Sequence, residues 1–294
     1  MLLYKSKKKS PGIRQKGFYF MMNQTKEKKR KAKAIIAMVN DKGGCGKSTS
    51  TFHIAGELAK RGRKVLAVDA DKQRNLTTFL LGEEESQYDE DNDGTLLDIM
   101  LGKEQIENVI KKNYIKVGNA KPQYMGIDVI PADAELEKQE IYFPLLKDKD
   151  LSGIFDDLDY DYIIIDCPPS NTMVEHFILE QWATHVLIPM SSDISSVMGM
   201  GDLIKKIDAA RKHNPELKII GAFYSMFLPM RNKSKKYFKA MERRFSNLFI
   251  ESYIPFLEDV TTSLEDEGRP LAFYRKSGAC KYVEELTSQI LKRL

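Results

Sequence analysis

Glycines, two lysines and a serine lie close together in residues 41–49, Asp-Lys-Gly-Gly-Cys-Gly-Lys-Ser-Thr. Small residues let backbone N–H groups point at phosphate oxygens, and the positive end of a following helix adds to that attraction. In such a site Lys47 would reach the β- and γ-phosphates of a nucleotide, and the Ser48 hydroxyl would ligate Mg²⁺. The usual pattern has glycine where Asp41 stands. This segment, called the phosphate loop below, therefore carries one irregular position and a surplus cation, Lys42.

Three aspartates follow apolar stretches. Asp69 and Asp71 come at and just after the end of residues 64–69, and Asp166 ends the apolar run of residues 160–166 and precedes two prolines. Open α/β sheets bind ligands at the carboxyl ends of parallel strands. Two carboxylates beside a phosphate loop favour metal or water handling. Asp166 is expected to hold Mg²⁺ through a water, and the prolines to fix a turn near the γ-phosphate.

The elements that must position these side chains alternate along the chain. Apolar stretches predict strands over residues 34–39, 64–69, 125–131, 160–166, 184–190, 218–224 and 249–255. Helical patterns follow over residues 50–59, 95–100, 106–110, 134–143, 195–212 and 282–294. The last helix is expected to turn Val283, Leu286, Ile290 and Leu294 to one face. This alternation predicts an α/β protein with one doubly wound, mostly parallel sheet and helices on both faces.

Composition excludes several classes of protein. The chain has 294 residues, 42% of them hydrophobic, but no run approaches the 18 apolar residues of a membrane-spanning helix. Its N-terminus lacks the apolar region of a signal peptide. Three distant cysteines, Cys45, Cys167 and Cys280, argue against a disulfide framework and a zinc site, and favour a reducing cytoplasm.

Charge is distributed unevenly. Residues 1–33 contain twelve Lys and Arg residues and one acid, a net charge of +11, which leaves −7 for the remainder because the whole chain carries +4. We expect residues 1–33 to form a flexible basic extension and residues 34–294 the folded domain. The extension would suit nucleic acid or an anionic membrane, or serve only as a solvated tail. Met21 and Met22 are alternative starts, and the acid-rich residues 83–95 are expected to form a solvent loop.

With these segments aligned, residues 34–294 resemble the ParA family of partition ATPases, within the ParA/MinD class that has a deviant Walker A motif. The resemblance rests first on residues 42–49, 68–77 and 165–170. It extends to residues 130–132, 253–255 and 268–271 and to Tyr274. The first three motifs together are highly specific.

The resemblance implies an Mg²⁺-dependent ATPase that forms an ATP-sandwich homodimer. Lys42 matches the signature lysine that reaches the nucleotide of the second subunit, and Asp71 matches the aspartate that orients the attacking water. Metal binding is assigned to Ser48 and Asp166, with Asp69 as an outer group that supports the metal site. The residues implied to hold ATP are Gly43, Gly44, Cys45, Gly46, Lys47, Ser48, Thr49 and, near the adenine, Pro255.

Two departures from the family pattern bear on function. Lys72 replaces a proline in the segment after Asp71, which is expected to loosen that loop. Acids at Glu258 and Asp259 stand where many relatives carry arginines for DNA binding. Basic residues gather elsewhere, at Arg231, Lys233, Lys235, Lys236, Lys239, Arg243 and Arg244. These are candidate contacts for non-specific DNA, or alternatively one solvated helix face.

The leading functional expectation is a cytoplasmic, nucleoid-associated ATPase that segregates a plasmid, chromosome or mobile element. A ParB-like centromere-binding protein would stimulate hydrolysis, which should be slow alone because the sequence shows no obvious arginine finger. The N-terminal extension is too short for a helix-turn-helix domain, so operator-specific autoregulation is not expected.

Two rivals share the phosphate loop. A MinD-like positioning ATPase would bind membrane through an amphipathic helix beyond the fold, whereas the sequence ends at Leu294 on a helix expected to pack on the sheet. The membrane is therefore not expected as a partner. An iron–sulfur reductase of the nitrogenase type would need two cysteines for a cluster, but Cys45 and Cys167 lie inside the nucleotide motifs.

Overall fold

The computed structural model describes residues 32–82, 94–115, 121, 123–169, 172–265, 269–273 and 277–294. Most of the predicted basic extension and of the acid-rich loop lies outside these described residues, as do Ser170, Gly268 and Tyr274. None of the helices in the described part of the chain has the length and apolar content that a membrane-spanning helix requires.

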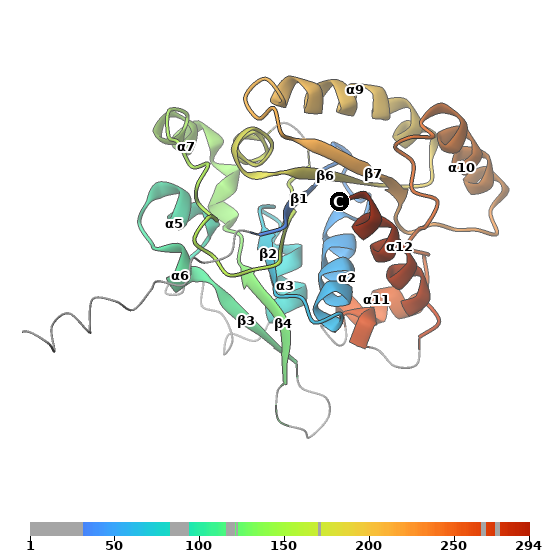
Figure 1. Cartoon of the computed structure of the whole chain (residues 1–294), viewed down its shortest axis with the longest axis horizontal. Helices are drawn as coiled ribbons and strands as arrows, with labels where there is room; N and C mark the ends of the chain where they lie inside the picture. The colour runs from blue at the N-terminus through green and yellow to red at the C-terminus, as the bar shows by residue number, and fades with distance from the viewer. Residues whose placement is uncertain are drawn as a thin grey trace, which may run out of the picture.

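A seven-stranded sheet forms the centre of the molecule (Figure 1). Its strands are β1 (Ala34–Met38), β2 (Val65–Asp69), β3 (Lys111–Ile115), β4 (Gln123–Ile130), β5 (Tyr162–Asp166), β6 (His185–Met190) and β7 (Lys218–Tyr224). They lie in the order β3-β4-β2-β5-β1-β6-β7, and every pair is parallel except β3 with β4. The predicted α/β class with a mostly parallel sheet is therefore confirmed.

Helices cover both faces of this sheet. The α-helices are α2 (Lys47–Lys60), α3 (Asn75–Leu81), α5 (Leu96–Leu101), α6 (Ile106–Val109), α7 (Gln139–Leu146), α8 (Met173–Phe177), α9 (Ile194–Ala210), α10 (Asn232–Arg244), α11 (Glu258–Glu265) and α12 (Cys280–Arg293). Short 3₁₀ turns η1 (Ala134–Glu137) and η3 (Leu271–Phe273) and a π-helical turn η2 (Ile178–Trp182) complete the set. One buried apolar layer joins the sheet to α5, α8, α9 and α10, and a second joins it to α2, α3, α11 and α12.

Apolar sequence explains why the central strands form. All residues of β1, β2 and β5 are buried, as expected for parallel strands covered on both faces. Their register brings the strand ends together, because Asp166 pairs with Met38 on one side and with Asp69 on the other. The phosphate loop and the three aspartates consequently meet at one edge of the sheet.

Three details of the predicted elements are wrong. Residues 249–255 do not form a strand: they meet the β7 side of the sheet through two separate bridges, Ala222 with Phe249 and Phe227 with Pro255. The helix predicted over residues 134–143 is broken at Lys138 into η1 and α7. The antiparallel edge strand β3, with the polar sequence Lys-Lys-Asn-Tyr-Ile, is absent from the predicted strands.

The end of the last helix also differs from the prediction. In α12 the side chains of Val283, Leu286 and Ile290 are buried, but Leu294 follows the helix and is exposed. The buried face therefore stops one turn earlier than the sequence pattern predicts.

Candidate nucleotide site

The phosphate loop connects β1 to α2 with glycine at two positions of left-handed backbone, Gly44 and Gly46. Gly46 is the N-cap of α2 with φ 83°, and a Cβ there would collide with the Ser225 hydroxyl at the end of β7. Ser225 also accepts a hydrogen bond from Ser50 at 3.2 Å. The loop is thus packed against Ser225, the residue directly after β7, and only glycine fits at that contact.

Lys47 is the first residue of α2 and is buried. Its Nζ donates to the carbonyl oxygen of Asn40 at 3.2 Å, which folds the side chain back across the loop. Asn40 is itself fixed, since its Nδ2 donates to the Pro189 carbonyl at 2.7 Å and its Oδ1 accepts from the Lys42 amide at 2.9 Å. The backbone before the loop is therefore tied to β6, with the Lys47 ammonium held at the loop.

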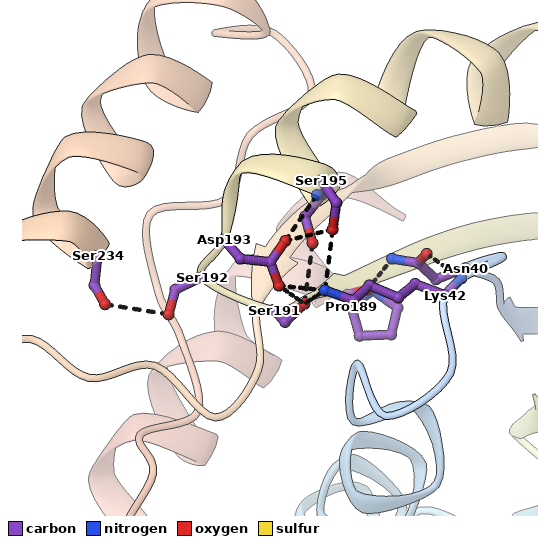
Figure 2. Close-up of polar contacts among 9 residues, drawn as sticks. Asn40, Lys42, Pro189, Ser191, Ser192, Asp193, Ser195 and Ser234 are labelled. Atoms are coloured by element: carbon purple, nitrogen blue, oxygen red, sulfur yellow. Dashed lines mark hydrogen bonds and ion pairs between the residues drawn. The ribbon is translucent and has the colours of Figure 1, made fainter.

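Lys42 points toward the start of α9 (Figure 2). Its Nζ forms an ion pair with Asp193 and donates to the hydroxyls of Ser191 and Ser195, each at 3.1 Å. Asp193 also caps α9 by accepting from the Ser196 amide at 3.1 Å. Partial burial opposes ionisation of Asp193, but the hydrogen bonds from Lys42, Ser195 and Ser191 outweigh it and hold the pKa of Asp193 well below its usual range.

The three predicted aspartates lie together at the strand ends but have different surroundings. Asp69 accepts hydrogen bonds from the Thr77 amide and hydroxyl, both at 2.8 Å, and from the Asp71 amide at 3.1 Å. Burial raises the pKa of Asp69, although these hydrogen bonds oppose the rise. Its carboxylate therefore fixes the chain after β2.

Asp166 has unsatisfied oxygens. It is fully buried, yet neither carboxylate oxygen has a hydrogen-bond partner within the described residues. Burial and the nearby charge of Asp69 raise the pKa of Asp166 well above its usual value. The adjacent Ser48 hydroxyl and the positive charge of Lys47 oppose that rise. Buried, unpaired carboxylate oxygens beside a serine hydroxyl suit a hard divalent cation.

The donor set fits Mg²⁺ rather than a metal held by protein alone. The described residues contain no group of three or more His, Cys, Asp or Glu side chains able to hold an ion. Mg²⁺ commonly takes one or two protein ligands and completes its shell with water and phosphate oxygens. Ser48 and Asp166 are the residues that would hold it here.

Asp71 lies next to this pair and is buried. Its Oδ1 accepts from the Gln73 amide at 3.0 Å, which orients the carboxylate. Lys72, the residue that replaces the usual proline, forms an ion pair with Glu137 of η1 at 2.9 Å. A cavity of about 360 Å³ lies beside them, lined by Asp71, Lys72 and Glu137 and by residues of the turn after Asp166.

Pro255 lies close to the loop between β7 and α10, since it forms a bridge with Phe227. In that loop Met226 has φ 54°, a left-handed conformation that is rare for a residue other than glycine. Pro255 is thus bridged to Phe227, two positions after Ser225. Ser225 in turn lies against the phosphate loop. The family resemblance places Pro255 near the adenine but gives no sign of Ser225.

The seven predicted basic residues gather on α10 and its N-cap. All seven are exposed, and none forms an ion pair with another described residue. The helix is anchored by its opposite face, where Met241 is buried and Phe238 stacks on Tyr224 at 6.0 Å between ring centroids. Its buried Ser234 shares a hydrogen bond with Ser192, next to Asp193, at 3.2 Å (Figure 2).

Besides Ser225, two residues of the site, Asn40 and Asp193, are missed by reasoning from the sequence. Asn40 stands directly before the phosphate loop, and that position is the signal that could have identified it. Asp193 gives no local signal, because it lies 151 residues from Lys42 and resembles any helix N-cap.

Comparison with known proteins agrees with this geometry. Residues 33–219 match the AAA_31 family of AAA domains. The chromosome partitioning protein ParA of Caulobacter vibrioides is 28% identical over 270 residues, which cover 88% of this chain and 94% of that protein. ParA of Myxococcus xanthus is 30% identical, with 88% of each chain covered.

Solved structures share the fold. Cobyrinic acid a,c-diamide synthase from Mycobacterium smegmatis, with bound ADP and magnesium, superimposes with a TM-score of 0.70 over 88% of this chain and 94% of its own, at 24% identity. Likeness at that level of identity establishes architecture and not activity. The sequence relatives and the matched domain together show that the chain belongs to the ParA family of partition ATPases, within the P-loop NTPases.

Proposed function

We propose that this protein is an ATP-dependent DNA-segregation ATPase acting on a chromosome, plasmid or mobile element. Support comes from its ParA family membership and from relatives that are chromosome partitioning proteins. The proposal includes a cytoplasmic, nucleoid-associated location and a ParB-like centromere-binding partner that stimulates hydrolysis.

In the proposed reaction the phosphate loop binds the phosphates of ATP through its backbone N–H groups. Lys47, here bonded to the Asn40 carbonyl, turns to the β- and γ-phosphates. Bound Mg²⁺ would neutralise charge on the phosphates, with Ser48 and Asp166 as its protein ligands. Asp71 orients the water that attacks the γ-phosphate, and the Gln73 amide holds its carboxylate in place.

Lys42 carries the dimer part of the proposal. A single site already has Lys47, so a second loop lysine is surplus unless another nucleotide lies within its reach. The Lys42 side chain is about 40% exposed, and the helix that holds its partners exposes the apolar side chains of Ile194 and Met198 in its first two turns. An exposed cation close to exposed apolar residues suits contact with a second copy of the chain across ATP.

DNA binding is assigned to the basic face of α10. Exposed cations without acidic partners attract phosphates and release counterions, which gives binding without sequence preference. The N-terminal residues 1–33, with a net charge of +11, would add to this attraction. The sequence shows no obvious arginine finger that would act within the same subunit, so slow hydrolysis is expected in the absence of a partner.

Three measurements on the purified full chain test the proposal. Sedimentation velocity with ATP, ADP or no nucleotide should show a dimer with ATP alone. A labelled random-sequence duplex should bind more tightly to that dimer. Flotation with anionic vesicles tests the MinD-like alternative, which the basic N-terminus favours. ATP-dependent binding to vesicles but not to DNA would contradict the partition proposal.

A further inference from the structure

Lys206, near the end of α9, lies between two carboxylates from distant parts of the chain. Its Nζ donates to Glu175 of α8 at 2.8 Å and also forms an ion pair with Asp41, the first residue of the phosphate loop. Glu175 and Asp41 are 31 and 165 residues from Lys206 in the sequence, so one ammonium group joins three separate segments.

These contacts are partly removed from water. The Glu175 side chain is 2% exposed and that of Lys206 is 18% exposed. Burial raises the pKa of Glu175, and the hydrogen bond from Lys206 opposes the rise. A buried carboxylate without a cation is unfavourable, so Glu175 fixes the position of the Lys206 ammonium. Asp41, which is more exposed, is then bound by the Lys206 ammonium, whose position Glu175 fixes.

The joined segments are those that must stay aligned around a nucleotide. Asp41 lies between Lys42 and Asn40, whose carbonyl accepts from Lys47. Glu175 lies in the helix that follows the turn after Asp166, and its amide donates to the Thr172 hydroxyl at 3.2 Å. The pair of contacts therefore links the start of the phosphate loop to the segment after the metal-binding aspartate.

We infer that Lys206 is a positioning residue for the nucleotide site. Its ammonium is occupied by two carboxylates, and it acts by holding Asp41 so that Lys47 and Asp166 keep their relative placement. Asp41 accordingly replaces the usual glycine because it supplies the carboxylate that Lys206 binds. This inference rests on the proposed ATP binding at the loop.

The test compares Lys206→Met with Lys206→Arg and with Lys205→Met in the full chain. Lys205 is the matched control, because its ion pair with Asp202 lies on the surface, where both side chains are about 80% exposed. Fluorescence titration with a labelled ATP analogue and Mg²⁺ gives the dissociation constant, and steady-state kinetics give KM and kcat. A misplaced loop should raise the dissociation constant and KM about tenfold in Lys206→Met. Lys206→Arg should recover most of that affinity, and Lys205→Met should match the wild type.

Asp41→Asn separates positioning from general stability, since it leaves the Lys206–Glu175 pair intact. It should weaken ATP binding with little change in melting temperature, and adding it to Lys206→Met should weaken binding no further. Wild-type affinity in a folded Lys206→Met or Asp41→Asn variant, or additive effects in the double variant, would overturn the inference. If Lys206→Met does not fold, Asp41→Asn alone decides. Failure of the wild type to bind ATP would instead overturn the proposed function.

Discussion

The helices α2 and α10 differ sharply in how far their residues are buried. Ten of the fourteen residues of α2 are buried, including Lys47, whereas only Ser234 and Met241 of the thirteen residues of α10 are buried. Lys47 has a fixed partner, the Asn40 carbonyl oxygen, and in the proposed function it acts on one nucleotide. The α10 cations face solvent without acidic partners in the described structure, so in the proposed function they would act together through charge. Single substitutions should therefore be severe at the first helix and mild at the second.

Lys47→Ala should produce the largest effect. Removing charge-assisted hydrogen bonds to phosphate oxygens should weaken ATP binding by about 10³-fold or more. Isothermal titration calorimetry with a non-hydrolysable ATP analogue measures this change. Lys60→Ala is the control, because Lys60 lies at the other end of α2 with a 45% exposed side chain. Equal weakening by both substitutions would contradict a fixed role for Lys47.

Asp71→Ala should separate hydrolysis from binding. Without the group that orients water, kcat should fall by about 10²-fold or more, while ATP affinity stays near that of the wild type. The variant should accumulate as an ATP-bound dimer that holds DNA, measured by gel filtration with a labelled duplex. Asp202→Ala, at an exposed acid of α9, serves as the control. Normal turnover by Asp71→Ala would show that another group orients the water.

Substitutions in α10 should weaken DNA binding gradually, in proportion to the charge removed. Replacing Lys235, Lys236 and Lys239 by alanine should weaken DNA binding by about 10- to 100-fold and lower the salt slope of log K by about 0.9 for each phosphate that is no longer neutralised. As a control, two exposed lysines elsewhere are replaced by alanine: Lys205 of α9 and Lys212 just after that helix. This control shows how much a loss of positive charge outside α10 weakens DNA binding. An unchanged salt slope in the α10 variant would remove this helix from the DNA-binding surface.

His53 should affect folding stability rather than ATP or DNA binding, and it probes burial in α2. Its Nδ1 accepts from the Leu271 amide at 3.3 Å, and burial lowers its pKa from 6.5 to about 3. As pH falls below 6.5 the unfolded chain binds the proton first. Stability should therefore decrease between pH 6.5 and about 3, by at most about 1.4 kcal/mol per pH unit.

Urea unfolding at pH 7.5, 6 and 5 measures the His53 effect. The fall in stability should be smaller in His53→Gln than in the wild type, whereas His213→Gln, at an exposed histidine, should leave it unchanged. The same pH dependence in His53→Gln and wild type would mean that other groups cause it.

The parts of the nucleotide site that depend on local sequence could be predicted. The parts that depend on packing between distant segments could not. The phosphate loop, Asp69, Asp71 and Asp166 could be located because glycines and strand-end carboxylates are visible within short segments. The partner of Lys42 could not, since Asp193 meets it only after β6 places α9 beside the loop. The polar edge strand β3 lacks the apolar run that marks a central strand. Residues 249–255 have such a run but meet the β7 side only at two points.

Lys42 is central to the proposed function, in which it serves the nucleotide of a second subunit. Sedimentation velocity of Lys42→Ala with saturating ATP and Mg²⁺, alongside calorimetry to confirm that ATP is bound, tests this role most directly. We predict an ATP-bound monomer under conditions where the wild type is a dimer. A Lys42→Ala protein that dimerises with ATP as fully as the wild type would contradict the proposed role of Lys42.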